Sequence, residues 1–278
     1  MTATPRMFVL DLGRFHLDRS LLVARATQAT RQNPHRPAEF VEIPVLAYCI
    51  DHPDGRILYD TGCNPHGPGP DGHWPEGLQN SFPYSGGEEC QLPNRLAQLG
   101  LGPDDIRHVV LSHLHFDHAG CVEFFRKSSL IVHEDELSAA MRNYALGPAR
   151  SAYPWAEINR WAHLGLNWRP LAADEGDVEL ADGVTVLNWG SGHAFGMLGL
   201  QVTLPDTGGV ILTSDAIYCA ENYGPPVRLP GIARDTLGAA RTIERIRRRA
   251  ERTRSQVWFG HDMAQFRTLR SSTEGWYE

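Results

Sequence analysis

Hydrophobic residues along this chain gather in short runs that are bounded by Gly, Pro, Asn or Asp. Runs of this length, rich in Val, Ile, Leu and aromatic residues, predict buried β-strands. The predicted strands cover residues 7–13, 41–51, 56–62, 108–113, 130–134, 184–189, 198–204, 209–215 and 256–262.

Other segments repeat their apolar residues at helical spacing. The clearest is 235–252, where the repeating residues are Leu237, Ala240, Ile243, Ile246 and Ala250. Further helices are predicted at 94–100, 134–146 and 152–165. Strands come in runs with helices between the groups, which predicts stacked sheets flanked by helices.

The segment 63–93 shows neither periodicity and is dense in Gly and Pro, so it is predicted to be a long loop. Long loops in compact domains are often functional. Two interpretations stay open for this one, an irregular crossing of the surface and a wall of the active site.

Composition narrows the class of protein. A chain of 278 residues with 42% hydrophobic residues can bury a large core. The net charge of −7 argues against nucleic acid or an anionic membrane as a partner. The arginine run 245–254 lies on a predicted amphipathic helix and is interpreted as its solvated outer face.

The cysteines and the chain start bear on localisation. The five cysteines are odd in number, widely spaced and without a C-x-x-C pair, which argues against a disulfide framework and a thiolate zinc site. They are Cys49, Cys63, Cys90, Cys121 and Cys219. Neither an export signal nor an uninterrupted apolar stretch of membrane-spanning length is recognisable, so we expect a cytoplasmic protein without membrane insertion.

The stretch "SHLHFDHAG" carries most of the candidate chemistry. It places His113, His115, Asp117 and His118 within six residues, directly after a predicted strand. Neutral imidazole and ionised carboxylate bind zinc-like divalent ions. A single histidine would more simply be a polar residue satisfied by a backbone hydrogen bond, but four ligands at fixed spacing indicate a metal site.

Three further candidate ligands follow other predicted strands. His193 lies in "NWGSGHAFG", Asp215 in "VILTSDAIY" and His261 in "VWFGHD". Seven ligands suffice for two ions that share a bridging carboxylate, with a water between them.

These residues resemble the metallo-β-lactamase superfamily, whose H-x-H-x-D-H signature is intact at 113–118. The chain is also similar to the N-acyl-homoserine lactonase group, through "HLHFDHAG" with Phe116, "DTG" at 60–62, "DAIY" at 215–218 and "FGHD" at 259–262. The resemblance runs from about residue 41 to 265. It implies an α/β fold, an αββα sandwich of two mixed β-sheets flanked by helices, as a single domain over 1–278 with a helical insertion around 134–168.

The resemblance also implies roles for single residues. One ion would be held by His113, His115 and His193, the other by Asp117, His118 and His261, with Asp215 bridging the two. Tyr218 would hydrogen-bond a lactone carbonyl, and Asp117 would shuttle a proton to the leaving oxygen. The chain departs from the family pattern at Cys121, where a second Gly is frequent, and at "SGHAFGM".

The function expected from this resemblance is metal-dependent opening of a lactone ring, most simply that of an N-acyl-homoserine lactone (quorum quenching). A hydroxide that bridges two divalent ions would attack the carbonyl. Zinc is the expected metal, with iron, manganese and cobalt as alternatives, and the substrate is a small-molecule lactone.

Several alternatives stay open. They are hydrolysis of a pyridoxolactone-like ring, a thioesterase of the glyoxalase II type, and a metal-free binding protein on the same scaffold. A homodimer is also open. Tyr218 has an alternative role as a core aromatic, and Asp60 is expected to be structural, as an acceptor that orients a metal-bound histidine. The aromatics at 144–168 are interpreted as packing residues, with an acyl-chain pocket as the alternative.

Overall fold

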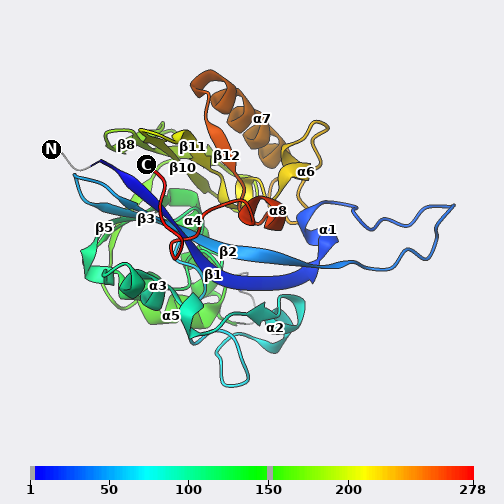
Figure 1. The fold of residues 1–278 in the computed structure, drawn as a ribbon. Helices are drawn as coiled ribbons and strands as arrows, with labels where there is room; N and C mark the ends of the chain where they lie inside the picture. Colours follow the sequence, from blue (N-terminus) through cyan, green and yellow to red (C-terminus); the bar gives the residue numbers. More distant parts are fainter. Residues whose placement is uncertain (1–3, 149–152) are drawn as a thin grey trace.

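Two stacked β-sheets form the centre of the molecule in the computed structural model, which describes residues 4–148 and 153–278 (Figure 1). The first sheet has seven strands in the order β4 (Tyr84–Ser85), β1 (Arg6–Asp18), β2 (Phe40–Asp51), β3 (Arg56–Tyr59), β5 (Ile106–Val110), β6 (Ser129–His133), β7 (Asn167–Leu171). The second has five, in the order β12 (Gln256–Trp258), β11 (Gly208–Leu212), β10 (Met197–Leu204), β9 (Val184–Gly190), β8 (Val178–Ala181).

Both sheets are mixed. In the first sheet β1, β2 and β3 pair antiparallel, whereas β3, β5, β6 and β7 pair parallel. In the second sheet only β11 and β12 pair parallel. The prediction of two mixed sheets is therefore confirmed, and all nine predicted strands are present.

Helices cover the outer faces of the sheets (Figure 1). The α-helices of the described residues are α1 (Arg19–Leu22), α2 (Glu76–Ser81), α3 (Leu92–Gln98), α4 (Glu134–Ala145), α5 (Trp155–Trp161), α6 (Ala220–Tyr223), α7 (Thr236–Thr253) and α8 (Met263–Phe266). Of these, α8 lies beside β2 instead, and its Phe266 packs against the layer between the sheets. The four predicted helices correspond to α3, α4, α5 and α7. The predicted range 152–165 was too wide, and its residue 152 lies outside the described residues.

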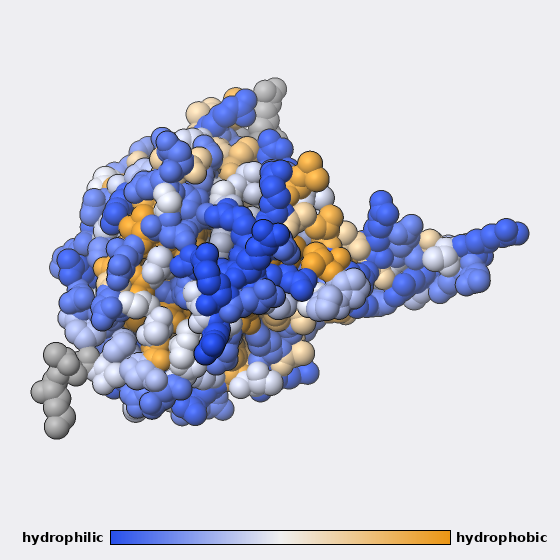
Figure 2. All heavy atoms as spheres, turned by 90° about the horizontal axis from the view of Figure 1, so that it is seen from above, coloured by the Kyte–Doolittle hydropathy of each residue, from blue (hydrophilic) through white to orange (hydrophobic). Residues whose placement is uncertain are grey.

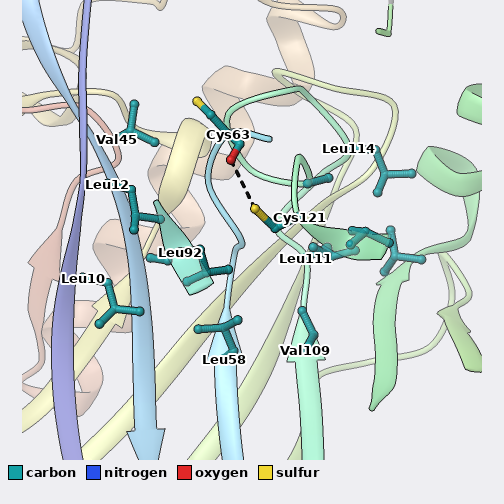
Figure 3. Close-up of a cluster of buried hydrophobic side chains, with 14 of the residues drawn as sticks. Leu10, Leu12, Val45, Leu58, Cys63, Leu92, Val109, Leu111, Leu114 and Cys121 are labelled. Carbon is teal, nitrogen blue, oxygen red and sulfur yellow. Dashed lines mark hydrogen bonds between the residues drawn. The ribbon is translucent and has the colours of Figure 1, made fainter. Parts of the chain in front are cut away.

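Alternating strand residues build the core in layers. On β10, Leu198, Leu200 and Val202 face the first sheet and pack between the sheets. On β9, Leu187 and Trp189 face the opposite way, toward α7. Figure 3 shows part of the layer beneath α3, where the Cys121 thiol donates to the Cys63 carbonyl oxygen at 3.2 Å. All five cysteines are free thiols.

Helix α7 differs from its prediction in two ways. Leu237 is 70% exposed, because the buried face instead uses Gly238, Ala239 and Thr242 beside Ile243. The arginine run is also only partly solvated. Arg245 donates to the carbonyl oxygens of Trp189 and Asn188 and so ties the helix to the second sheet, whereas Arg248 stays on the outside.

The segment 63–93 is not wholly irregular, since it forms α2 and β4. Between α1 and β2 a second long segment projects from the body as an arm, and Figure 2 shows that its surface is mostly hydrophilic. Within the described ranges, no helix combines the length and apolar character needed to cross a membrane.

Candidate metal centre

All seven predicted ligands meet at one edge of the sandwich, beyond the carboxyl ends of strands from both sheets. His113, His115, Asp117 and His118 follow β5 of the first sheet. His193 follows β9, Asp215 follows β11 and His261 follows β12, all in the second sheet. The two sheets are joined directly beside these ligands, because the Leu198 amide on β10 donates to the Ser112 carbonyl oxygen, next to His113, at 2.9 Å.

The first group of ligands contains His113, His115, His193 and Asp215. The Nδ1 atom of His115 lies 2.9 Å from the Nε2 atoms of both His113 and His193. The Oδ2 atom of Asp215 lies 3.2 Å from His193 Nε2 and 3.8 Å from His113 Nε2. Four donor atoms thus converge on one point.

The second group contains Asp117, His118 and His261. Asp117 Oδ2 lies 3.5 Å from His118 Nε2 and 3.6 Å from His261 Nε2. The other oxygen of Asp215, Oδ1, lies 3.2 Å from His118 Nε2 and 2.8 Å from His261 Nε2. Asp215 therefore presents one oxygen to each group, which is the arrangement of a bridging carboxylate.

The donors fit a pair of divalent ions. Two ligands at about 2.0–2.1 Å from a tetrahedral ion are separated by about 3.3 Å, and the distances above scatter around that value. His118 Nε2 and Asp215 Oδ1 are both buried and lie 3.2 Å apart, and among the described residues neither atom has a hydrogen-bond partner. Buried polar atoms are rarely left unsatisfied, so both atoms are suited to bind a cation.

Electrostatics distinguish the two groups. Burial lowers the pKa of His113, and it lowers the pKa of His193 to about 4, so both are neutral and able to bind metal. Burial also opposes protonation of His118 and His261, but the carboxylates of Asp215 and Asp117 outweigh it and raise their pKa values. Without cations, protons on these two histidines balance the carboxylates, so metal binding here releases protons.

The outer nitrogens of the histidines are held by neighbouring groups, as metal-binding imidazoles require. His113 Nδ1 lies 3.0 Å from Ser112 Oγ, and His261 Nδ1 lies 2.9 Å from the Pro44 carbonyl oxygen. His118 Nδ1 lies 2.9 Å from Asp60 Oδ2. This is the orienting contact that the sequence predicted for Asp60.

Tyr218 lies at the metal centre and lines the cavity above it. Its hydroxyl is 2.7 Å from the outer nitrogen of His193, Nδ1. Burial, together with the charges of Asp215 and Asp117, raises the pKa of Tyr218, so the hydroxyl keeps its proton at neutral pH. The contact with His193 could not be found from the sequence, since it depends on the path of two separate loops.

A cavity of about 420 Å³ opens above the ligands. Its walls are mainly apolar and come from the N-terminal strand and helix, from the segment 63–93 and from the segment after α4. The lining residues besides the ligands and Tyr218 are Phe15, Leu17, Leu21, Leu22, Ile43, Pro75, Leu78, Phe82, Phe116, Tyr153, Pro154 and Ile232.

The lining of this cavity bears on two open interpretations. The segment 63–93 contributes Pro75, Leu78 and Phe82, so it walls the site. Of the aromatics at 144–168, Tyr153 lines the cavity. Tyr144 stacks on Trp155 and Trp161 packs on Trp168, so these four serve packing.

Fold and site together define a class of metal-dependent hydrolases. A family model described as the metallo-β-lactamase superfamily matches residues 41–249, and the chain belongs to this superfamily.

Known relatives narrow the similarity further. The chain is 50% identical over 273 residues to the N-acyl homoserine lactonase AiiB of Agrobacterium fabrum, covering 98% of this chain and 99% of that protein. A crystal structure of an AiiA mutant from B. thuringiensis with N-decanoyl-L-homoserine bound at the active site superposes with a TM-score of 0.79 at 28% identity, over the whole of both chains. A structure of an N-acyl homoserine lactone hydrolase with N-hexanoyl-L-homoserine bound at the catalytic metal center gives the same TM-score, identity and coverage.

Proposed function

We propose that this protein is a dinuclear metal-dependent lactonase that opens the ring of N-acyl homoserine lactones. The observation that carries the proposal is the position of Asp215, whose two oxygens face two ligand groups at the floor of an apolar cavity. The 50% identical relative named N-acyl homoserine lactonase supports the choice of substrate.

The cofactor is a pair of divalent ions. The protein offers histidine nitrogens and aspartate oxygens as ligands, and this set favours zinc. His113, His115 and His193 would hold one ion, Asp117, His118 and His261 would hold the other, and Asp215 would be shared. When bound, such a pair lowers the pKa of a water between the ions and polarises the ester carbonyl.

Tyr218 supplies a hydrogen bond to the substrate carbonyl. Because Nε2 of His193 faces the metal centre, Nδ1 carries the ring proton and donates to the Tyr218 oxygen at 2.7 Å. The proton of the Tyr218 hydroxyl is then free to point into the cavity. There it stabilises the negative charge that develops on the carbonyl oxygen when water adds to the ring.

Asp117 moves the proton. Its carboxylate lines the cavity from the second group, with Oδ2 at 3.6 Å from His261 Nε2. It takes up the proton released when water adds to the carbonyl carbon, and gives it to the ring oxygen as the carbon–oxygen bond breaks. The product is an N-acyl homoserine, an open hydroxy acid.

The apolar walls accommodate the acyl chain. The ring of Phe116 packs edge-on against Phe15, with 5.4 Å between the ring centroids, and its centroid lies 5.8 Å from that of Phe82. Three aromatic rings thus form one side of the cavity. An alkyl chain lying against them buries apolar surface on binding. A small ring lactone without such a chain leaves this surface exposed.

A substrate panel with controlled metal content tests the proposal. The metal-free protein and the zinc-reconstituted protein are assayed by titrating the acid released from N-hexanoyl and N-decanoyl homoserine lactone, a pyridoxine-derived lactone and a glutathione thioester. We expect zinc-dependent turnover that is fastest on the homoserine lactones. Turnover that survives chelation, or a clear preference for the thioester, would overturn the proposal.

A further inference from the structure

Glu136 on α4 is a fully buried carboxylate that has no part in the chemistry above. Four donors surround it. Its Oε1 accepts from the Leu114 amide and the Tyr153 hydroxyl, each at 3.0 Å. Its Oε2 accepts from the Phe195 amide at 3.0 Å and the Gly196 amide at 3.4 Å.

The donors come from the segments that carry the first ligand group. Leu114 stands between His113 and His115, and Phe195 and Gly196 follow His193. These segments leave different sheets, one after β5 and the other after β9. One side chain therefore fixes the distance between two loops that must place three imidazoles around one point.

The second ligand group has no comparable tie to this carboxylate. In the described ranges, the hydrogen bonds of Glu136 go to Leu114, Tyr153, Phe195 and Gly196. The outer nitrogen of His118 instead lies against Asp60 Oδ2 and Ser214 Oγ, and that of His261 against the Pro44 carbonyl oxygen. Glu136 therefore ties the two segments of the first group together and, among the described residues, makes no hydrogen bond to the ligand side chains of the second.

We propose that Glu136 is a positioning residue for the first ligand group, and that it sets the affinity of that group for its ion without setting that of the second. The inference rests on the proposed dinuclear site. It extends that site by assigning the first ion a supporting carboxylate outside the ligand set.

Glu136→Gln tests this with almost no change in volume. All the backbone partners of Glu136 are donors, whereas the amide of Gln offers only one acceptor oxygen. If the NH₂ replaces Oε2, it faces the amides of Phe195 and Gly196. If it replaces Oε1, Tyr153 can turn to accept from it, but the Leu114 amide still loses its acceptor. Either orientation leaves a buried backbone N–H unpaired in a ligand segment.

Glu157 provides a matched control. It is also a buried carboxylate whose pKa is raised by burial, as is that of Glu136. Its oxygen accepts from Trp74 Nε1 at 2.7 Å and faces His73 Nε2 at 3.3 Å, so it ties α5 to the cavity wall and not to a ligand segment. Glu157→Gln removes a buried charge equally.

The experiment is a metal titration of the metal-free proteins, in which Co²⁺ absorption spectra and competition with a zinc chelator give the affinity for each ion. His115→Ala supplies the reference spectrum of the second group alone. We expect Glu136→Gln to bind one ion about 10- to 100-fold more weakly, the size usual for loss of an orienting partner. The ion that stays should give the spectrum of the His115→Ala reference, and Glu157→Gln should bind both ions as the unaltered protein does.

Three results would overturn the inference: unchanged affinity for both ions in Glu136→Gln, equal weakening of both ions, or the same selective loss in Glu157→Gln. An unaltered protein that does not bind two ions would instead refute the proposed function. Should Glu136→Gln not fold, Glu136→Asp applies the same test, because it keeps the charge but is one carbon too short to reach both loops.

Discussion

Asp60 offers the sharpest test of how the second ligand group is held. Its Oδ2 accepts from His118 Nδ1 at 2.9 Å and from the hydroxyls of Ser112 and Ser214, while its Oδ1 accepts from the Ser112 amide at 2.7 Å. Its backbone has a φ of 62°, in the left-handed region. Asn tolerates this conformation better than most residues, so Asp60→Asn changes the side chain without adding backbone strain.

The contacts define what Asp60→Asn loses. The Ser112 amide requires an acceptor at Oδ1, so the amide oxygen of Asn takes that position and its NH₂ replaces Oδ2. The NH₂ can still donate to the two serine oxygens. It cannot accept from His118 Nδ1, which carries the ring proton when Nε2 binds an ion. The substitution therefore removes one charge-assisted hydrogen bond to one ligand.

The magnitude follows from two independent considerations. A hydrogen bond to a charged group contributes about 1.5–3 kcal/mol. Mutation of a partner that orients a metal ligand costs about 10- to 100-fold in metal affinity, which is about 1.4–2.7 kcal/mol. Both give about 2 kcal/mol, or roughly a 30-fold weaker second ion.

Chelator competition at fixed pH measures this loss, with Asp51→Asn as the control. Asp51 also pairs with cationic side chains, Arg6 and Arg56, but it does so away from the ligands. Asp60→Asn should weaken the ion held by His118, and Asp51→Asn should weaken neither. If Asp60→Asn folds and binds both ions as tightly as the unaltered protein, the orienting role assigned to Asp60 is wrong.

Four shorter predictions concern the same site. Gly196→Ala should lower the free energy of unfolding in urea by about 1–3 kcal/mol, because a Cβ there would lie 2.2 Å from the buried ring of His133. Tyr218→Phe should reduce kcat/KM for lactones by roughly 100-fold with metal content unchanged, as loss of an oxyanion donor does. Calorimetry of the metal-free protein should show stability falling as pH rises above 6.5, because folded His118 keeps a proton that the unfolded chain has released by then, whereas the metal-loaded protein should not show this loss. Phe82→Ala should raise KM for the decanoyl lactone by about 10-fold and more than for the hexanoyl lactone, since it removes apolar wall surface.

Local sequence pattern was sufficient to select the seven residues that the structure brings together. Each candidate followed an apolar run, and strands that end at one edge of a sandwich bring such residues together. His193, Asp215 and His261 are far from the motif at 113–118 in sequence, yet their candidate ligand atoms lie within 4.8 Å of those of motif residues. Their residue types and their places after strands were enough to select them.

Three edge strands, β4, β7 and β8, were missed; β4 has only two residues, and the other two were missed for a physical reason. β7 reads "NWRPL" and buries mainly Leu171, and β8 reads "VELA" with no fully buried residue. An edge strand faces a neighbour on one side only, so it does not need the apolar run that predicts a central strand. The pairing of β7 with β6 fixes it in the sheet despite Pro170.

Glu136 was missed because its signal is weak. A Glu in the first turn of a helix is ordinarily explained by the helix dipole. The one clue was its spacing from Ala139 and Ala140, which lie three and four residues on and share its buried face. The loops that donate to it are fixed by sheet packing, which local pattern does not describe.

The metal centre is itself a contact between the two sheets. Ser214, just after β11, has its Oγ 3.1 Å from Asp60 Oδ2 and 2.9 Å from Ser112 Oγ, and these two partners follow β3 and β5 of the first sheet. Asp60 and Ser214 also share left-handed backbone conformations, with φ of 62° and 45°. Such residues cost about 1–3 kcal/mol each and persist only where the surroundings enforce them. Here the apolar layer between the sheets provides that enforcement, so the position of Asp215 between the two ligand groups is set by the sandwich before any ion binds.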